Sequence, residues 1–230
     1  MSKLVKRGVV SFLAMILCSN AMAAFVLNGT RFIYEEGKRN VSFEVTNNAD
    51  DTYGGQVWID NSNQGSSVYM VPAPPFFKVG TKQKQIVRII KTDTPLPTDR
   101  ESLFWLNVQE IPPKPENAEG NVLSVAVNTR VKLFYRPESL IKGRKDAEKK
   151  IKVLRLGEGT FLSNPTPYYF AVVGIKVNGQ SLKLTETEQN ALAVLEPFGK
   201  ASLGNRVLNG SIAVEAVNDW GATETFELQK

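Results

Sequence analysis

The chain has 230 residues, a formal net charge of +5, no histidine and one cysteine. The lack of histidine excludes Ser-His-Asp and Cys-His nucleophile systems and the commonest zinc ligand. The cysteine, Cys18, lies in a segment that we expect to be removed, so disulfides are excluded from the mature chain. A hydrolase or another enzyme is therefore poorly supported, and we expect no catalytic residues, metal or cofactor.

Residues 1–23 have the features of a secretory signal peptide. Three basic residues lie within 3–7, an apolar core spans 9–18, and a small-x-small cleavage pattern follows at 21–23. The core is too short to span a bilayer, and no later segment reaches about 20 apolar residues. Cleavage is thus favoured over an uncleaved membrane anchor. We expect a mature chain that begins at Ala24, is not inserted in a membrane and lies outside the cytoplasm.

The net charge of the mature chain is low. Removing the signal takes away three basic and no acidic residues, which leaves +2 and gives no basis for nucleic-acid binding. The cluster from Lys142 to Lys150 is interrupted by Asp146 and Glu148, so it is interpreted as a solvated segment.

Short β-rich segments separated by turn residues begin at Phe25. Seven strands in about 110 residues are typical of an immunoglobulin-like sandwich, and no helical periodicity competes with them. The predicted strands are Phe25–Tyr34, Val41–Asn47, Gln56–Asp60, Val68–Val71, Gln85–Lys91, Leu103–Gln109 and Val122–Tyr135.

The last of these strands is the longest. From Asn121 to Pro137 the residues alternate, with Leu123, Val125 and Val127 on one face and polar side chains on the other. The Arg136-Pro137 pair ends it. A strand this long can lend its backbone to another protein. From the pattern alone, however, burial of its apolar face in its own domain is favoured.

A second β-rich set follows a polar stretch at residues 138–150. Its predicted strands are Ile151–Leu156, Thr160–Ser163, Tyr168–Val177, Leu182–Leu184, Ala191–Leu195, Ser211–Val217 and Thr223–Leu228, with a hairpin turn at Asn178-Gly179. The sequence therefore predicts an all-β chain of two immunoglobulin-like domains, at residues 24–140 and 141–230, each of about 100 residues.

Several motifs are similar to those of one family. They are NGTR at 28–31, PP at 74–75, RESLFW at 100–105, EIPP at 110–113, TRVKLFYRP at 129–137, NPTPYY at 164–169 and NDWG at 218–221. With these the chain resembles the PapD-like periplasmic pilus chaperones of bacterial chaperone–usher systems. The resemblance implies a boomerang of two immunoglobulin-like domains with a cleft between them. It also implies a periplasmic chaperone that lends a strand to incomplete pilus subunits and delivers them to an outer-membrane usher.

The resemblance assigns roles to individual residues. Leu123, Val125 and Val127 match the family's donor positions, whereas Val131 and Leu133 lie nearer the hinge and are expected in the core. In the family such side chains fill pockets of the subunit, while backbone hydrogen bonds provide affinity.

Arg31 and Lys132 match the family's basic pair, which binds the terminal carboxylate of the subunit and thereby sets the register of the added strand. The residue types suit this role, because arginine offers a planar fork and lysine a compact charge. Without the resemblance, each would be read as a solvated strand side chain.

Glu101, Arg136 and Asp219 match a family ion network that bridges the domains. The competing interpretation of Glu101 and Asp219, a pair of carboxylates for acid–base catalysis, has no other support in the sequence. Pro74 matches a cis proline of the family. Phe76 and Phe77 form either an exposed apolar patch or the cap of a sandwich edge.

The chain departs from some members of the family. It lacks their disulfide near the C-terminus, so packing alone must hold that end. Its loop before the donor strand, Pro112 to Gly120, is short, which in the family goes with rod-like, multi-subunit pili. An unpaired apolar edge also predicts weak self-association of the free protein.

One alternative from another class stays open. A secreted two-domain binding protein, such as an adhesin or a structural subunit, could use the same sandwiches. A subunit would instead carry an N-terminal extension and often a disulfide. The Arg31 and Lys132 pair favours the chaperone, which needs no nucleotide because folding of the subunit drives the process.

Overall fold

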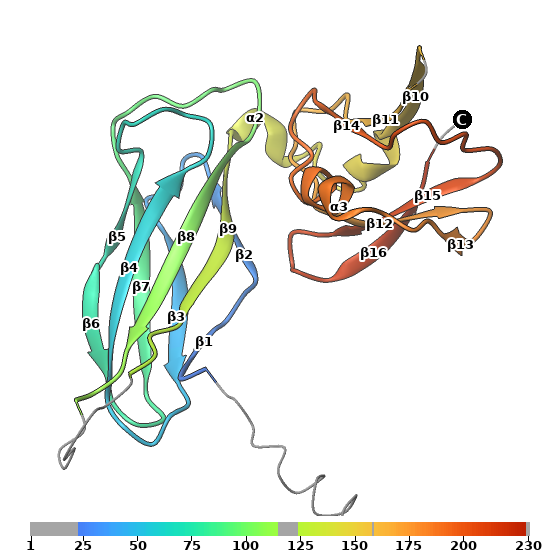
Figure 1. Ribbon diagram of the computed structural model, residues 1–230. Helices are drawn as coiled ribbons and strands as arrows, with labels where there is room; N and C mark the ends of the chain where they lie inside the picture. The colour runs from blue at the N-terminus through green and yellow to red at the C-terminus, as the bar shows by residue number, and fades with distance from the viewer. Residues whose placement is uncertain (1–22, 115–123, 158, 229–230) are drawn as a thin grey trace, which may run out of the picture.

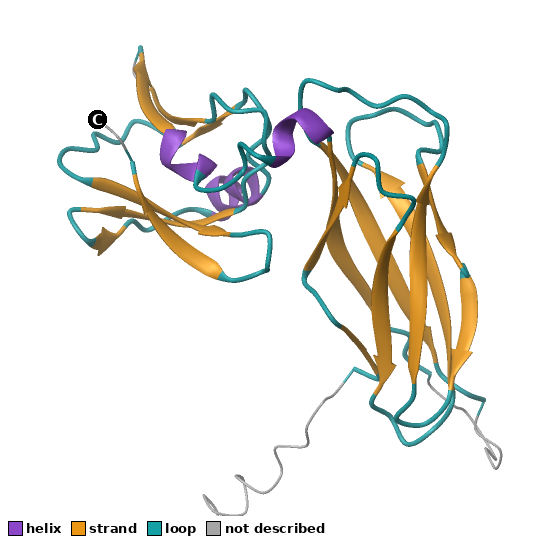
Figure 2. Cartoon of the chain, turned by 180° about the vertical axis from the view of Figure 1, so that it is seen from behind, coloured by secondary structure: helices purple, strands orange, loops and turns teal. Residues whose placement is uncertain are grey.

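The computed structural model describes residues 23–114, 124–157 and 159–228. Within these ranges strands predominate, and they form two β-rich bodies that meet at an angle beside a short helix, as the two opposite views show (Figures 1 and 2). The proposed signal peptide falls almost wholly outside the described residues. Among those described, no helix has the length and apolar character needed to cross a membrane.

The first body is a sandwich of two sheets. One sheet has the order β1-β3-β7-β5, with β1 at Phe25–Leu27, β3 at Val41–Asn47, β7 at Lys84–Lys91 and β5 at Met70–Ala73. The other has the order β2-β9-β8-β4-β6, with β2 at Arg31–Glu35, β9 at Asn128–Arg136, β8 at Ser102–Ile111, β4 at Tyr53–Asn61 and β6 at Phe76–Val79.

Alternate residues of both sheets fill one apolar core. Phe43 and Val45 of one sheet and Leu106 and Leu133 of the other are fully or almost fully buried. This is the outcome of period-two alternation, because successive side chains of a strand face opposite sides of the sheet. Leu133 lies in the core as predicted, and Val131 packs against it from a partly buried position.

The predicted strand Phe25–Tyr34 is wrong as a single element. It is two strands in different sheets: β1 pairs antiparallel with β3, and β2 pairs parallel with β9. Between them, Asn28 uses its side-chain oxygen to accept a hydrogen bond from the Glu44 amide at 2.9 Å. The chain changes sheets here, which brings Arg31 beside β9.

The long strand predicted at Val122–Tyr135 is shorter in the structure. β9 begins at Asn128, and the described residues 124–127 are not in a strand. Its end at Arg136, just before Pro137, is as predicted. The bond between Ala73 and Pro74 is cis. Phe76 is exposed, whereas Phe77 stacks on Phe25 with ring centroids 6.1 Å apart.

The second body is also built of two sheets around its own core. One has the order β10-β11-β14, at Lys152–Leu156, Gly159–Ser163 and Lys200–Ser202. The other has the order β13-β12-β15-β16, at Gln180–Ser181, Val172–Val177, Ile212–Val217 and Thr223–Glu227. Helical segments are α2 at Glu138–Ile141, η1 at Ala147–Lys150 and α3 at Glu186–Ala193. The hairpin turn at Asn178-Gly179 is confirmed by positive φ at both residues.

Two strand predictions for this body are wrong. Ala191–Leu195 was predicted as a strand, but its first residues end helix α3. Thr185 begins that helix with a capping box, in which its side chain accepts from the Glu188 amide and Glu188 accepts in return. The short β13 lies at Gln180–Ser181 rather than Leu182–Leu184. Neither β14 in this body nor β6 in the first body was predicted.

Candidate functional site

The alternation of β9 gives its hinge-side end two different faces. Leu133 and Tyr135 point into the core of the first body. Lys132, Phe134 and Arg136 therefore point the other way, toward the second body, where the Phe134 ring lies 6.0 Å from that of Tyr169. One strand thus supplies both the core and the junction.

Arg31 and Lys132 are neighbours in the parallel pairing of β2 with β9. Arg31 Nη1 donates to the carbonyl of Val217 at 2.8 Å, and Lys132 Nζ donates to the carbonyl of Ala193. Both acceptors belong to the second body, at the end of β15 and at the end of α3. Each cation is thereby held by a backbone dipole from the facing domain.

The surroundings weaken the hydration of both cations. Burial, together with the neighbouring Arg31 charge, lowers the pKa of Lys132 to about 8. Burial also lowers the pKa of Arg31, against the opposing effect of Asp219, and Arg31 Nε is buried without a hydrogen-bond partner. Two adjacent, partly desolvated cations are suited to bind one carboxylate through charge-assisted hydrogen bonds.

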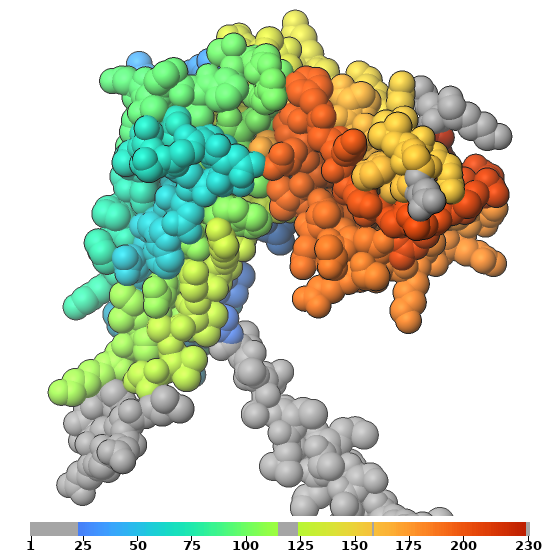
Figure 3. Space-filling view, turned by 45° about the horizontal axis from the view of Figure 1, so that its top comes forward, coloured from blue at the N-terminus to red at the C-terminus, as the bar shows by residue number. Residues whose placement is uncertain are grey.

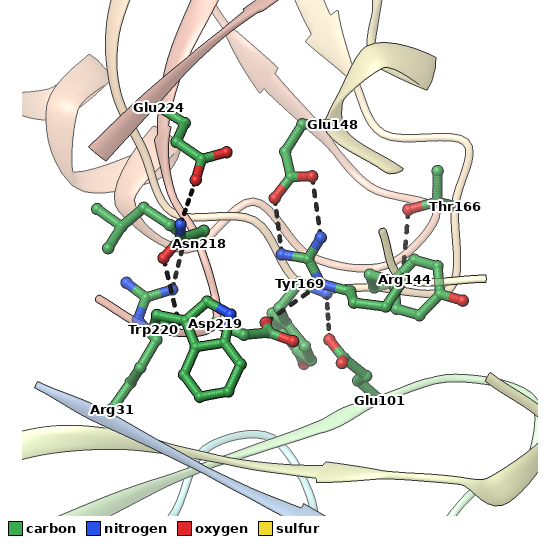
Figure 4. Close-up of polar contacts among 12 residues, drawn as sticks. Arg31, Glu101, Arg144, Glu148, Thr166, Tyr169, Asn218, Asp219, Trp220 and Glu224 are labelled. Carbon is green, nitrogen blue, oxygen red and sulfur yellow. Dashed lines mark hydrogen bonds and ion pairs between the residues drawn. The ribbon is translucent and has the colours of Figure 1, made fainter. Parts of the chain in front are cut away.

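Glu101, Arg136 and Asp219 meet at the junction of the bodies. Figure 4 shows the two carboxylates there, Glu101 from the first body and Asp219 from the second. Arg136 Nε donates to Glu101 Oε1 at 2.6 Å, and its Nη1 and Nη2 donate to the two oxygens of Asp219 at 2.6 and 3.0 Å. Glu101 Oε2 accepts from the Tyr169 amide at 2.8 Å. Glu101, directly before β8, and Asp219, between β15 and β16, are thus joined through the guanidinium of Arg136.

Sequence reasoning missed two members of this network. Arg144 and Glu148 are buried and form a two-bond pair at 2.6 and 2.9 Å, and Arg144 Nε lies 3.4 Å from Asp219 Oδ1. The interpretation of residues 142–150 as a solvated segment is therefore wrong for these two. A short run of mixed charge carries no signal that tells a buried pair from a solvated one.

The carboxylates of the network are held in different electrostatic environments. Burial raises the pKa of Glu101, although Arg136 opposes it. Burial acts in the same direction on Asp219, but the hydrogen bonds and charge of Arg136, helped by Arg144, outweigh it and keep the Asp219 pKa below its usual value. Among the described residues, no group of three or more His, Cys, Asp or Glu side chains could hold a metal ion.

Of the three candidate donor residues, Leu123 lies outside the described residues. Val125 is 66% exposed and Val127 is 40% exposed. The Val127 carbonyl accepts from the Glu110 amide at 3.0 Å, so the backbone still runs beside β8 at Val127, just before β9 begins. Burial in the domain's own core, which the alternation alone favoured, does not hold for Val125 and Val127.

Comparison with known families shows which family this chain belongs to. Residues 24–141 match the family model for the N-terminal domain of PapD, a pili and flagellar-assembly chaperone, and residues 146–228 match that for the C-terminal domain of the pili assembly chaperone PapD. The chain belongs to the PapD family of pili assembly chaperones. The PapD fold of two immunoglobulin-like sandwiches and a role as a chaperone of pilus assembly follow from this membership.

Individual relatives agree with the family. The chaperone protein FanE of Escherichia coli is 49% identical over 216 residues, which cover 94% of each chain. The structure of the periplasmic chaperone SfaE has a TM-score of 0.70 and 35% identity, covering 88% of this chain and 97% of that one. The SafB chaperone of Salmonella enterica, in complex with the SafA pilin, shares the fold with a TM-score of 0.76 at 24% identity, over 92% and 99% of the chains.

Proposed function

We propose that this PapD-family protein acts in the periplasm, where it binds, folds and caps incomplete pilus subunits by lending them a strand and delivers them to an outer-membrane usher. Its relative SafB has been solved in complex with a pilin, and its relative SfaE is described as periplasmic. The signal-like residues 1–23 support the same compartment. The proposed domains, 24–140 and 141–230, each contain one of the two cores.

The lent strand is the continuation of β9. Leu123, Val125 and Val127 recur at every second position and can enter pockets on one side of a subunit. Fully burying each such side chain stabilises by about 1.5–3 kcal/mol, so three contribute roughly 5–9 kcal/mol before ordering costs. The exposure of Val125 and Val127 supports this role, because these side chains are available to a partner.

Arg31 and Lys132 bind the terminal carboxylate of the subunit. The observation that carries the proposal is their adjacency on β2 and β9, on the strand that continues to Val125. A carboxylate fixed by both cations sets the register of the added strand, and a slip of one residue would turn every side chain to the wrong face. The carboxylate replaces the carbonyls of Val217 and Ala193 as the acceptor.

The ion network of Glu101, Arg136 and Asp219 holds the angle between the domains. Neither binding nor delivery includes a chemical step, so the protein is not an enzyme and needs no cofactor or nucleotide. Weak self-association of the free protein follows from its exposed apolar segment.

Alanine substitution of the two cations tests the proposal. Arg31→Ala and Lys132→Ala should each abolish co-purification of the cognate pilin, after both proteins are expressed in the periplasm, while leaving the melting temperature close to that of the wild type. Lys84→Ala is the matched control, because Lys84 is an exposed cation on the opposite sheet, paired with Glu44. Wild-type levels of pilin captured by both Arg31→Ala and Lys132→Ala would refute the proposal.

A further inference from the structure

Trp220 is 93% exposed, at the tip of the turn between β15 and β16. Tryptophan is large and on average highly buried, and its exposure to water costs free energy in proportion to its apolar area. The preceding residue, Asp219, points into the ion network of the junction. Asp219 is therefore held in the ion network, whereas the next residue, Trp220, is left in solvent.

The turn that presents Trp220 is fixed. Asn218 Oδ1 accepts from the amides of both Trp220 and Ala222 at 3.0 Å, and the Asn218 amide donates to the Ala222 carbonyl at 2.9 Å. Gly221 has a φ of 86°, in the left-handed region that favours glycine. A partner that binds Trp220 thus has to order one side chain and not a loop, which lowers the entropic cost of binding.

The same turn lies against the first domain, beside the Arg31 and Lys132 pair. Gly221 packs so closely on Thr30 that no Cβ would fit between them, and the next residue, Arg31, donates to the carbonyl of Val217 at 2.8 Å. In Figure 4 the indole projects from the turn toward the first domain, near the Arg31 side chain. Figure 3 shows the molecule hollowed between its two bodies, below their junction.

We propose that Trp220 is a contact of the second domain with the bound pilus subunit, inserted against aliphatic side chains next to the subunit's terminal carboxylate. The inference rests on the proposed function, because the carboxylate on Arg31 and Lys132 places the end of the subunit in this part of the cleft. Truncated tryptophans at the centre of interfaces are among the residues that cost most binding free energy, since burial removes a large apolar area from water. The subunit is thereby held from both domains.

Dissociation of the chaperone–pilin complex tests this. The cognate pilin is purified as its complex with wild type, Trp220→Ala, Trp220→Phe or Val207→Ala, and its release is followed as transfer to an excess of labelled wild-type chaperone. Trp220→Ala should speed release by about tenfold or more, the size expected of a truncated hot spot. Trp220→Phe should recover most of the loss. Val207 is 64% exposed in the same domain but lies beside β10, so Val207→Ala should leave release unchanged.

A second measurement observes the side chain directly. The chain contains three tryptophans, Trp58, Trp105 and Trp220. Labelled with 5-fluorotryptophan, the free chaperone should give three ¹⁹F signals, and the one missing from Trp220→Phe belongs to Trp220. Addition of unlabelled pilin should move that signal and reduce its exposure to a soluble paramagnetic agent.

The outcomes separate the two proposals. Release from Trp220→Ala within twofold of wild type, with an unmoved ¹⁹F signal, overturns the inference alone if Arg31→Ala still abolishes capture. Wild-type chaperone that captures no pilin overturns both. An equal effect of Val207→Ala would mean that any exposed apolar residue of this domain acts alike, which also overturns the inference.

Discussion

Lys132 on β9 donates a hydrogen bond from its ammonium group to the carbonyl of Ala193, the last residue of helix α3 in the other domain. The carbonyls at the C-terminus of a helix carry partial negative charge and favour a cation. In the free protein Lys132 is therefore paired with an acceptor weaker than a carboxylate. In the proposed function, binding a subunit would exchange that acceptor for a charged one, and the protonation of Lys132 would become part of the equilibrium.

Capture of subunits should depend on pH through Lys132. Its pKa is about 8 in the free protein, and a bound carboxylate favours the protonated form. Affinity should therefore be full below pH 8 and fall above it, by at most about tenfold per pH unit. Titration of pilin binding between pH 6.5 and about 9.5 by surface plasmon resonance measures the slope.

Lys132→Arg is the control for this dependence, because an arginine stays protonated over the whole range. Its affinity should be flat with pH, whatever its absolute value. Unfolding does not explain a loss in the wild type: the folded pKa lies below that of an unfolded lysine, so this group adds to the free energy of unfolding as pH rises from 8 toward 10.5. If the affinities of the wild type and Lys132→Arg fell equally with pH, the assignment of the pH dependence to Lys132 would be contradicted.

Asp219→Asn should weaken the junction between the domains. It leaves the guanidinium groups of Arg136 and Arg144 without their shared carboxylate. Removing one member of a fully buried pair costs about 3–5 kcal/mol, and we expect roughly 2–3 kcal/mol here because the Asp219 side chain is 27% exposed. Chemical denaturation measures the loss, and small-angle X-ray scattering should show a broader range of interdomain angles.

Asp99→Asn is the matched control for that variant. Asp99 also pairs with an arginine, Arg100, but both side chains are exposed, so the denaturation midpoint should not move. A scattering profile for Asp219→Asn that overlays on that of the wild type would show that the network does not hold the angle.

Val125→Glu should separate binding from folding. Val125 is exposed, so the melting temperature should stay within a degree or two of wild type, about the effect of a few tenths of a kcal/mol, while pilin capture is lost. Leu133→Ala, on the buried part of the same face, should do the reverse and cost about 2–5 kcal/mol of stability. A lower melting temperature for Val125→Glu that matches that of Leu133→Ala would place Val125 in the core instead.

The free chaperone should associate weakly and reversibly. Val125 and Val127 expose aliphatic surface next to the end of a strand, which invites pairing with a second copy. Sedimentation velocity should show a weight-average coefficient that rises with concentration for the wild type and less for Val125→Glu. A single monomer boundary at millimolar protein would count against this expectation.

Much of the fold follows from alternation in the sequence. The segments Val41–Asn47 and 85–91 are strands at almost the predicted bounds, and the arginine before Pro137 ends β9 as expected. The change of sheets between β1 and β2 could not be found in this way, because alternation does not tell which sheet a strand joins. The helix at Glu186–Ala193 had a usable signal in Thr185 and Glu188, a capping-box spacing that the strand interpretation passed over.

The candidate site was predictable only in part. Composition argued against Ser-His-Asp and Cys-His nucleophile systems and removed the commonest zinc ligand, but the pairing of Arg31 with Lys132 joins residues far apart in the sequence, and only the family resemblance put them together. The burial of Arg144 had no sequence signal, since it depends on a tertiary contact with Asp219. Trp220 belongs to the NDWG motif at 218–221, yet its exposure is a property of the folded turn.

The segment that connects the sandwiches contains part of the ion network at the junction, because Arg144 and Glu148 follow shortly after α2. Grafting the second sandwich onto a foreign first sandwich would transplant Arg144, Glu148 and Asp219 but leave Glu101 and Arg136 behind. A hybrid would keep the interdomain angle only if the recipient sandwich already has a carboxylate and a guanidinium at the positions of Glu101 and Arg136. The angle between the domains thus depends on residues of both, so the two domains can be exchanged only as a pair.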